Sequence, residues 1–433
     1  MNSTVLEIDP ITPHVQNSQS HSKESNTAQA SKPLQHSGCL HGLAHLMTRV
    51  FNGENVEDLG LDLVNRGKQG DADALLDLSI LLQLLGEPAN GLEVQRQALE
   101  IKRSYLLRSP KKKNTLTLLA IVAPGNLMTN TPIEFIAESA GFSVQFLYMD
   151  PTLPIPSKLP KHDLAMVAIS ELDRNLPTLD YLASWIDVWP RPVINAPGRI
   201  SVLGRDQICL QLQHQVGIEM PVTVRVSRGV LNDTADGRLS LLELTPDASL
   251  PIIIRPTDSH AGEGLERLET RLALKDYLLR HTEEEYFVSR YVDYRSDDGQ
   301  FRKYRIVLID GQPELAHMAV SDHWMVHYGI AGMEQSVEKR EEEASVMADF
   351  NQGFAQRHAA AFQTLHNTVG LEYFGIDCAE SKDGELLLFE VCASLNIHAM
   401  DSVALYPYKQ PHMQSIFKNF SGMLQRKAMT LIN

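Results

Sequence analysis

The sequence predicts an α/β protein that follows an N-terminal all-α helical module. Residues 39–107 carry apolar side chains at helical spacing, residues 115–170 alternate strand-like and helix-like runs, and residues 371–398 form two strand-like runs joined by a turn. The length of 433 residues allows two to four domains, and a hydrophobic fraction of 43% is enough for sizeable buried cores. We therefore expect a multidomain globular protein.

Composition and charge limit the classes of partner that we expect this protein to bind. A formal net charge of -15 argues against a nucleic-acid partner, because binding to phosphate backbones depends on clustered Lys and Arg. No apolar run approaches the roughly 18 residues of a membrane span, and the polar start lacks the apolar region of a signal peptide, so we expect no membrane association and a cytoplasmic location. The four cysteines form no CxxC pair, which disfavours a disulfide framework or a structural zinc site.

The N-terminal third divides into a tail and a helical module. Residues 1–36 are rich in Ser, Asn, Gln and His, and we expect a disordered tail because they cannot bury enough apolar surface to offset the entropy of ordering. Residues 37–110 predict two apolar helices broken at Gly86-Glu87-Pro88. This pair resembles one tetratricopeptide-type unit, without a second copy of the ~34-residue period. The module could cap the rest of the chain, mediate a homodimer or bind a protein partner.

The fold class changes after the basic, breaker-containing stretch 109–114, "SPKKKN". Residues 114–200 predict a Rossmann-like domain of alternating strands and helices, and residues 201–433 predict a second domain. Parallel layers place ligand sites at the carboxyl ends of their strands. The loop around Asn126 lies at such an end, where a plain turn and a ligand loop are both open.

A basic residue on a buried strand precedes a glycine-containing loop in "LPIIIRPTDSHAGEGLERLE". Arg255 and the backbone N–H groups of such a loop can converge on phosphate oxygens. The stretch is not a P-loop, because GxxxxGK[ST] is absent, and a surface hairpin is the alternative.

The segment from 283 to 332 predicts three strands and a polar loop. Asp310-Gly311 has the composition of a hairpin turn. The loop "SDHWMVHYGIAG" then gathers His323, Trp324, His327 and Tyr328. It could pack on the core, recognise a substrate or hold zinc, although HExxH spacing is absent.

Two carboxylates fall near one end of the C-terminal hairpin. If the strands pair around Lys382-Asp383-Gly384, Asp377 and Glu390 lie side by side. Two such carboxylates repel unless a cation lies between them, and Mg²⁺ takes oxygen ligands of this kind. The alternative is a pair of exposed acids at strand ends.

Together, these motifs resemble ATP-grasp enzymes over Asn114 to Leu424, in particular RimK-type glutamate ligases and D-alanine–D-alanine ligases. The resemblance rests on the asparagine before "APGRI", on "RDQ", on "GIEMPVT" and on the final pattern G-(I/V)-D, turn, (F/M)-E-V-x-A-S. It implies an α+β ATP-grasp fold with ATP as a cofactor and one or two Mg²⁺ ions on Asp377 and Glu390. Cys392 stands where typical members carry an Asn ligand, and a neutral thiol is a poor Mg²⁺ ligand. Asn396 or a water could replace that ligand, the second metal could bind weakly, or catalysis could be lost.

The same resemblance implies roles for other positions. Arg255 would contact the ATP phosphates, with Ser259 to Gly264, including Gly262, as a lid over them. Arg305 would face phosphate and substrate, while Lys303 occupies the position of the ribose-binding Asp. Gln207 replaces a typical Lys, for which the nearby Arg205 could compensate. The linker that recognises adenine would consist of Ser289, Arg290, Tyr291 and Val292.

The resemblance implies an ATP-dependent ligase that joins a carboxylate to an amine through an acyl phosphate and releases ADP and phosphate. The expected partner is a small molecule or peptide with a carboxylate, together with an amine acceptor. Trp324, His327, Tyr328 and the Asn126 loop are the candidates for substrate contact. The alternatives are an ATP-binding regulatory or scaffold protein with a degenerate site, and a small-molecule kinase of the same fold.

Overall fold

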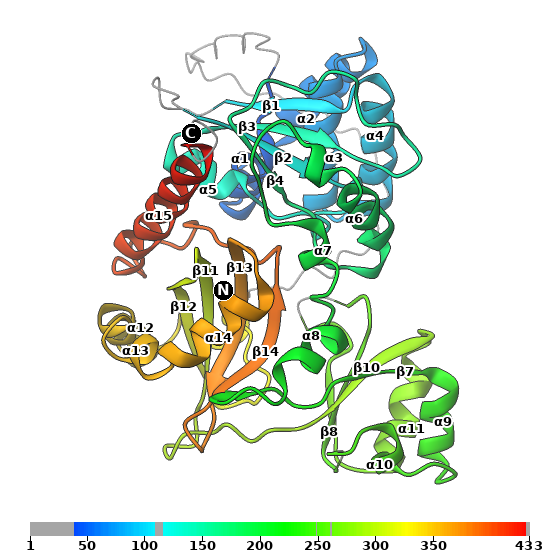
Figure 1. The fold of residues 1–433 in the computed structure, drawn as a ribbon, viewed down its shortest axis with the longest axis vertical. Coiled ribbons are helices and arrows are strands. Elements are labelled where there is room, and N and C mark those ends of the chain that lie inside the picture. The colour runs from blue at the N-terminus through cyan, green and yellow to red at the C-terminus, as the bar shows by residue number, and fades with distance from the viewer. Residues whose placement is uncertain (1–38, 109–115, 248, 260–261, 430–433) are drawn as a thin grey trace, which may run out of the picture. The chain divides into compact units, whose positions relative to one another are not determined.

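The computed structural model describes residues 39–108, 116–247, 249–259 and 262–429 (Figure 1). The predicted tail at 1–36 and the stretch 109–114 lie outside the described residues. The chain divides into two compact units between Lys102 and Arg103. None of the helices in the described ranges is both long enough and apolar enough to cross a membrane.

The first unit is a set of helices built around a buried one. Its helices are α1 (Gly42–Phe51), α2 (Glu57–Lys68), α3 (Ala72–Leu84) and α4 (Pro88–Ile101). Asp71 caps α3 by accepting hydrogen bonds from the N–H groups of Asp73 and Ala74. The predicted break before Pro88 is confirmed, because Pro88 begins α4.

The helical pattern predicted to reach Leu107 is wrong beyond Ile101. Residues Ser104–Leu107 form strand β1, which pairs antiparallel with β3 (Ser143–Tyr148) of the second unit. Tertiary pairing decides the conformation of this short apolar segment, because its local pattern suits a helix and a strand equally.

The first sheet of the second unit is mostly parallel. Its strand order is β1-β3-β2-β4-β5, with β2 to β5 parallel and β1 antiparallel at the edge. The alternation of strand and helix predicted from the sequence is confirmed here. The further elements are β2 (Thr117–Val122), β4 (Leu164–Val167), β5 (Val193–Ile194), α5 (Glu134–Ala140), α6 (Leu176–Ala183) and α7 (Pro197–Ile200).

The second sheet is antiparallel, with strand order β7-β10-β8-β9. It buries its own core, in which apolar residues from β8 and β10 pack against α9 and α11. Its elements are β7 (Val224–Ser227), β8 (Ile252–Pro256), β9 (Glu266–Leu268), β10 (Glu285–Arg290), α9 (Arg228–Ala235), α10 (Leu241–Leu244) and α11 (Arg271–Arg280).

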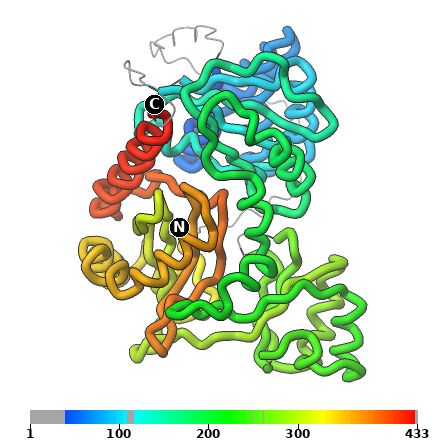
Figure 2. The backbone as a smooth tube through the Cα atoms, viewed as in Figure 1, coloured from blue at the N-terminus to red at the C-terminus, as the bar shows by residue number. Residues whose placement is uncertain are grey.

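The third sheet has the order β12-β11-β13-β14-β6. Figure 2 shows the strands of residues 301–321, in yellow, beside those of residues 373–392, in orange. The Asp310-Gly311 hairpin turn is confirmed, with φ of 49° and 78°. The elements are β6 (Ile218–Glu219), β11 (Phe301–Ile309), β12 (Gln312–Ser321), β13 (Tyr373–Glu380), β14 (Leu386–Cys392), α8 (Arg205–Leu212), α12 (Val337–Asp349), α13 (Phe354–Arg357), α14 (Ala359–Val369) and α15 (Lys409–Met429).

A continuous hydrophobic cluster joins the first and third sheets. It extends from Leu119 and Val167 in the parallel sheet, through Ile208 in α8, to Ile306 and Ile376 in the third sheet. This shared core fixes the carboxyl end of β4 relative to the tip of β14, where the candidate site lies.

Candidate functional site

The β13–β14 hairpin places Asp377 opposite Glu390, as the sequence predicted. The strands keep this register up to Asp377, after which a bulge shifts it. Both side chains therefore lie at one end of the hairpin, and Cys392 follows Glu390 on the same face of β14.

Asp377 is held by two cations from the neighbouring strand. Arg305 is its register partner on β11 and donates from Nε to Oδ1 at 2.9 Å and from an Nη to Oδ2 at 3.0 Å, while Lys303 Nζ donates to Oδ2 at 3.0 Å. Burial alone would raise the pKa of Asp377, which is 4% exposed, but the charges of Arg305 and Lys303 outweigh burial and hold the pKa well below its usual range. Asp377 is therefore ionised, and both of its oxygens accept hydrogen bonds.

Glu390 is paired with Arg205, the first residue of α8. An Arg205 Nη lies 2.9 Å from Glu390 Oε1, and the other donates to the Phe389 carbonyl at 2.8 Å. Burial raises the pKa of Glu390, yet the charge of Arg205 opposes it and the net shift is downward. Arg205, which could compensate for the typical Lys that Gln207 replaces, thus reaches the tip of the hairpin.

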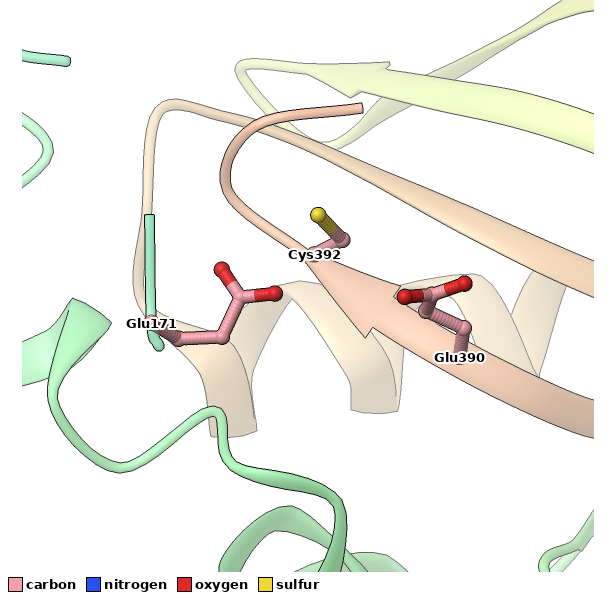
Figure 3. A group of neighbouring side chains, drawn as sticks. All are labelled: Glu171, Glu390 and Cys392. Atoms are coloured by element: carbon pink, nitrogen blue, oxygen red, sulfur yellow. The ribbon is translucent and has the colours of Figure 1, made fainter. Parts of the chain in front are cut away.

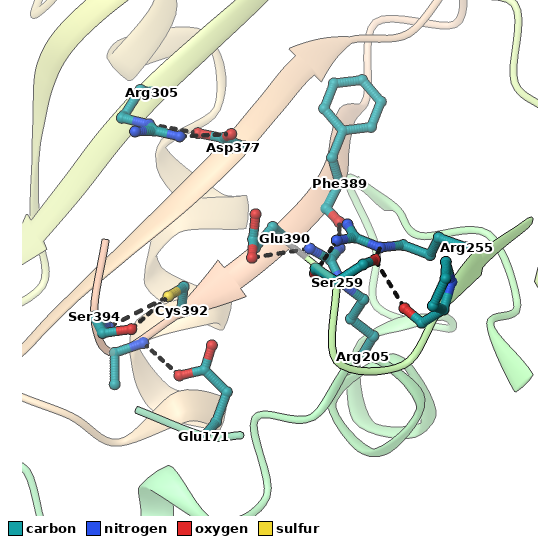
Figure 4. A network of polar contacts seen from close by, with 12 residues as sticks. Glu171, Arg205, Arg255, Ser259, Arg305, Asp377, Phe389, Glu390, Cys392 and Ser394 are labelled. Carbon is teal, nitrogen blue, oxygen red and sulfur yellow. Dashed lines mark hydrogen bonds and ion pairs between the residues drawn. The ribbon is translucent and has the colours of Figure 1, made fainter. Parts of the chain in front are cut away.

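Arg255 approaches the same carboxylate from β8. Its Nε donates to Ser259 Oγ at 3.1 Å, and an Nη donates to the Ser259 carbonyl (Figure 4). Burial and the charge of the nearby Arg205 together lower the pKa of Arg255 to about 9, against the opposing charge of Glu390. Arg205 and Arg255, which we call the arginine pair, therefore carry two like charges beside one carboxylate.

The loop after β8 approaches the polar loop 321–332. Gly262 and Gly264 have φ of 85° and 61°, a region that favours glycine. A Cβ at Gly262 would lie 3.6 Å from Met325 Sδ, so Gly262 of the predicted lid lies beside the predicted substrate loop. Residues 260 and 261 of this loop lie outside the described residues.

The predicted adenine linker, residues 289–292, begins within β10. Ser289 and Arg290 pair with β8, and the side chain of Arg290 bonds Glu219 at 2.8 Å and Asp247 at 3.0 Å. The Arg290 side chain is thus tied to acidic partners, and the backbone of Ser289 and Arg290 belongs to the sheet; recognition of adenine by this linker stays a prediction.

The aromatic ring of Tyr291 joins this linker to the polar loop. The backbone N–H of Tyr291 donates to the Pro251 carbonyl at 3.0 Å. The centre of the Tyr291 ring lies 4.0 Å from the Arg267 guanidinium and 6.0 Å, edge to face, from the centre of the Trp324 ring. Tyr291 and Trp324 are therefore arranged together, although they come from different elements; Val292 follows them into the packing of the third sheet.

The two remaining substrate candidates of the polar loop have different surroundings. Burial lowers the pKa of His327, and the charges of Lys303 and Arg305 lower it further, so a neutral His327 faces these cations. Tyr328 instead donates its hydroxyl to the buried Glu343 at 2.8 Å. His327 is therefore available to a ligand, whereas Tyr328 anchors the loop.

Sequence reasoning missed Glu171, which lies four residues after the end of the parallel strand β4. Its carboxylate accepts a hydrogen bond from the Ala393 N–H at 3.1 Å, and burial raises its pKa. Among the described residues, one group of three metal-donor side chains has its donor atoms within 4.8 Å of one another: Glu171, Glu390 and Cys392. The strand-end rule that drew attention to Asn126 applies equally to Glu171.

Two asparagines considered from the sequence lie in different settings. Asn126 Oδ1 accepts from Met128 N–H at 3.1 Å and from Arg174 at 3.0 Å, so it closes a turn. Asn396 Oδ1 is buried and has no hydrogen-bond partner in the described structure. Asn396 thus keeps a free acceptor, whereas Asn126 does not present one.

The side chains around the hairpin tip suit the binding of a polyanion better than the binding of Mg²⁺ between Asp377 and Glu390. Lys303, Arg305 and the arginine pair surround the tip of the hairpin, and phosphate oxygens are natural partners for such cations. Asp377, however, already accepts three hydrogen bonds from Lys303 and Arg305. A thiol at Cys392 is also a poor donor to Mg²⁺. Asp377 as it stands is occupied by Lys303 and Arg305, and a Mg²⁺ ion shared by Asp377 and Glu390 stays a prediction.

No protein-family model matches this sequence, and no curated protein matches it. Among solved structures, the chain is similar to a RimK-domain ATP-grasp protein from Sphaerobacter thermophilus, with a TM-score of 0.41, 12% identity and coverage of 71% of this chain and 99% of that one. It is similar to a D-cycloserine synthetase, also with a TM-score of 0.41 and 12% identity, over 72% of this chain and 99% of that one.

Proposed function

We propose that this protein is an ATP-dependent ligase that joins a carboxylate to an amine through an acyl phosphate. The observation that carries the proposal is the arginine pair. Arg205 and Arg255 lie beside the single carboxylate of Glu390, and within the described residues the hydrogen bonds of the Arg255 side chain go to Ser259. A half-buried cation whose pKa is lowered by burial and by a second cation gains stability when a polyanion arrives.

The arginine pair would hold the terminal phosphates of ATP. A carboxylate oxygen of the substrate would attack the γ-phosphorus, the bond from that phosphorus to the β,γ-bridging oxygen would break, and ADP would leave. Charge spreads over the transferred phosphoryl oxygens, so fixed guanidinium donors stabilise this step electrostatically. The loop after β8, which includes Ser259, would close over the phosphates and exclude water.

The second step needs an amine close to the acyl phosphate. The amine nitrogen would attack the acyl carbon and lose a proton to solvent, the carbon–oxygen bond to phosphate would break, phosphate would leave, and an amide would form. Trp324 and His327 lie in the loop that faces Lys303 and Arg305, and they are the proposed contacts for the substrates. A small molecule or peptide carrying these groups is the proposed partner, and ATP is the proposed cofactor.

Nucleotide binding and product identity test the proposal. Purified protein is incubated with ATP, Mg²⁺ and a pool of amino acids and small peptides, and nucleotides and new amides are identified by mass spectrometry. ADP together with an amide whose mass equals the two substrates less water supports a ligase. ADP with a phosphorylated pool member indicates the kinase alternative, and AMP would contradict both.

One observation favours a second candidate, an ATP-binding regulatory protein. Lys303 and Arg305 both bind Asp377, so the carboxylate that the motif assigns to metal is neutralised by the protein itself. In that case the protein would bind ATP at the arginine pair and retain it unchanged with every acceptor tested. Retained ATP after prolonged incubation therefore distinguishes the regulator from the ligase.

A further inference from the structure

Three side chains with metal-binding atoms meet at the tip of β14. Glu390 and Cys392 are two residues apart on this strand and share a face, and Glu171 faces them from the loop that follows β4 (Figure 3). The two carboxylates and the thiol lie within 4.8 Å of one another. Because Glu171 is more than two hundred positions away in sequence, only the fold brings this set together.

The surrounding backbone holds these donors in place. Glu171 accepts a hydrogen bond from Ala393 N–H at 3.1 Å, and the Ala393 carbonyl accepts one from Thr131 Oγ1 at 3.0 Å. Cys392 Sγ accepts from Ser394 N–H at 3.3 Å. The strand-end loops of the first sheet are thus tied directly to the chain that leaves β14, which limits the rearrangement needed for a ligand to bind.

The chemistry of this set differs from that of a Mg²⁺ site. Mg²⁺ requires oxygen ligands, whereas zinc-class divalent ions accept carboxylate oxygen and cysteine sulfur together. Ligands around a tetrahedral zinc ion lie about 3.5 Å apart, as follows from metal–oxygen and metal–sulfur distances of about 2.1 and 2.3 Å. The observed limit of 4.8 Å is wider than this spacing, so the three side chains must move closer together on binding, and Glu390 Oε1 starts from an ion pair with Arg205 at 2.9 Å.

We propose that Glu171, Glu390 and Cys392 bind one divalent ion of the zinc class, with a coordination position left open for an oxygen of nucleotide or substrate. On binding, the Sγ–H bond of Cys392 breaks, the Sγ–metal bond forms, and the proton passes to the buffer. Asp377 stays with Lys303 and Arg305. The proposal deepens the proposed function by naming the metal class of the same site, and its test does not depend on turnover.

Cobalt binding provides the test, because Co²⁺ bound to a thiolate gives a sulfur-to-metal charge-transfer absorption in the near ultraviolet. The full chain is stripped with a chelator and titrated with Co²⁺. We expect this band at one equivalent of Co²⁺, its loss on addition of Zn²⁺, and no change with a large excess of Mg²⁺. Zn²⁺ should also protect Cys392 of the unmutated protein from alkylation, as followed by peptide mass spectrometry.

Matched variants identify the ligands. Cys392→Ser should remove the band, whereas Cys39→Ser, in the helical unit, should retain it. Glu171→Gln should weaken Co²⁺ binding at least about 10-fold, as loss of a metal-site partner does, while Glu341→Gln on the exposed face of α12 should not. Far-ultraviolet circular dichroism checks that each variant is folded.

Several results would overturn the proposal. The absence of the band from the unmutated protein would do so, and this result needs no variant to fold. A band that persists in Cys392→Ser would assign the thiolate elsewhere, and displacement of Co²⁺ by equimolar Mg²⁺ would indicate an ordinary oxygen site. Absence of ligase activity in a protein that binds Co²⁺ as expected would refute the proposed function and leave the metal site standing.

Discussion

Replacing Lys409 with Met tests the buried charge cluster that anchors the polar loop. Lys409 is 1% exposed, lies 2.8 Å from Asp401 and 3.4 Å from Glu343, and donates to the Tyr328 hydroxyl. Its Nζ also lies 3.9 Å from the centre of the Tyr328 ring. The side chain therefore neutralises Glu343 and fixes the loop that carries Trp324.

The size of the effect follows from what the substitution leaves behind. Glu343 is 0% exposed, and removing one partner of a buried ion pair costs about 3–5 kcal/mol, because the other charge stays buried. At about 2–4 °C per kcal/mol, the melting temperature should fall by about 6–20 °C. Thermal unfolding followed by near-ultraviolet circular dichroism measures this fall.

The loss should depend on pH in one direction. Burial raises the pKa of Glu343 above 4.5 and Lys409 lowers it, so removing Lys409 raises it further. A carboxyl group with a raised pKa in the folded state destabilises the fold increasingly as the pH rises from about 4.5 through that pKa. The deficit of Lys409→Met should therefore be smaller at pH 5 than at pH 8.

The double variant Lys409→Met/Glu343→Gln provides the control, since it removes the buried charge of Glu343 together with that of Lys409 and leaves only the more exposed Asp401. It should recover at least half of the lost melting temperature, because a neutral amide can remain buried with its hydrogen bonds. A single variant that melts within 2 °C of the unmutated protein at both pH values, on an error of about 1 °C, would refute the assigned role of Lys409.

Three further predictions concern the site and its support. Arg255→Ala should weaken ATP binding about 10- to 100-fold in calorimetry, because one charged hydrogen bond is lost. The control Arg238→Ala, in which the replaced side chain is 61% exposed, should bind ATP as the unmutated protein does. Equal ATP affinities of Arg255→Ala and the unmutated protein would remove Arg255 from the nucleotide site. Asn195→Ala should destabilise the fold by about 2–4 kcal/mol in thermal unfolding, because the Asn195 side-chain amide forms hydrogen bonds with both the N–H and the carbonyl of Tyr373, and Asn195 has a φ of 56°. An unchanged melting temperature would contradict this prediction. Glu390→Gln should abolish ADP release but keep the fold, and an active variant would show that the charge of Glu390 is not needed.

The sequence predicted the strands and the hairpins where local patterns are strong. The Asp310-Gly311 turn needs residues that tolerate positive φ, and the β13–β14 register follows from a short turn between two apolar runs. Local pattern was insufficient for Ser104–Leu107, whose conformation depends on pairing with a strand some forty residues further along the chain.

The site was predictable only where its residues belong to one motif. Asp377 and Glu390 could be paired from the hairpin alone, but the bonds from Lys303 to Asp377 depend on the placement of β11 beside β13. Glu171 was not foreseen, because its approach to Cys392 requires the first and third sheets to share a core. Contacts between sheets leave little trace in a single sequence.

Trapping with hydroxylamine tests the central claim most directly. The protein is incubated with ATP, divalent metal, a pool of carboxylic acids and hydroxylamine, without any other amine. An acyl phosphate predicts equal amounts of ADP and of one hydroxamate, which identifies the carboxylate substrate. Consumption of ATP without a hydroxamate, or no consumption across the whole pool with ATP demonstrably bound, would contradict the ligase mechanism.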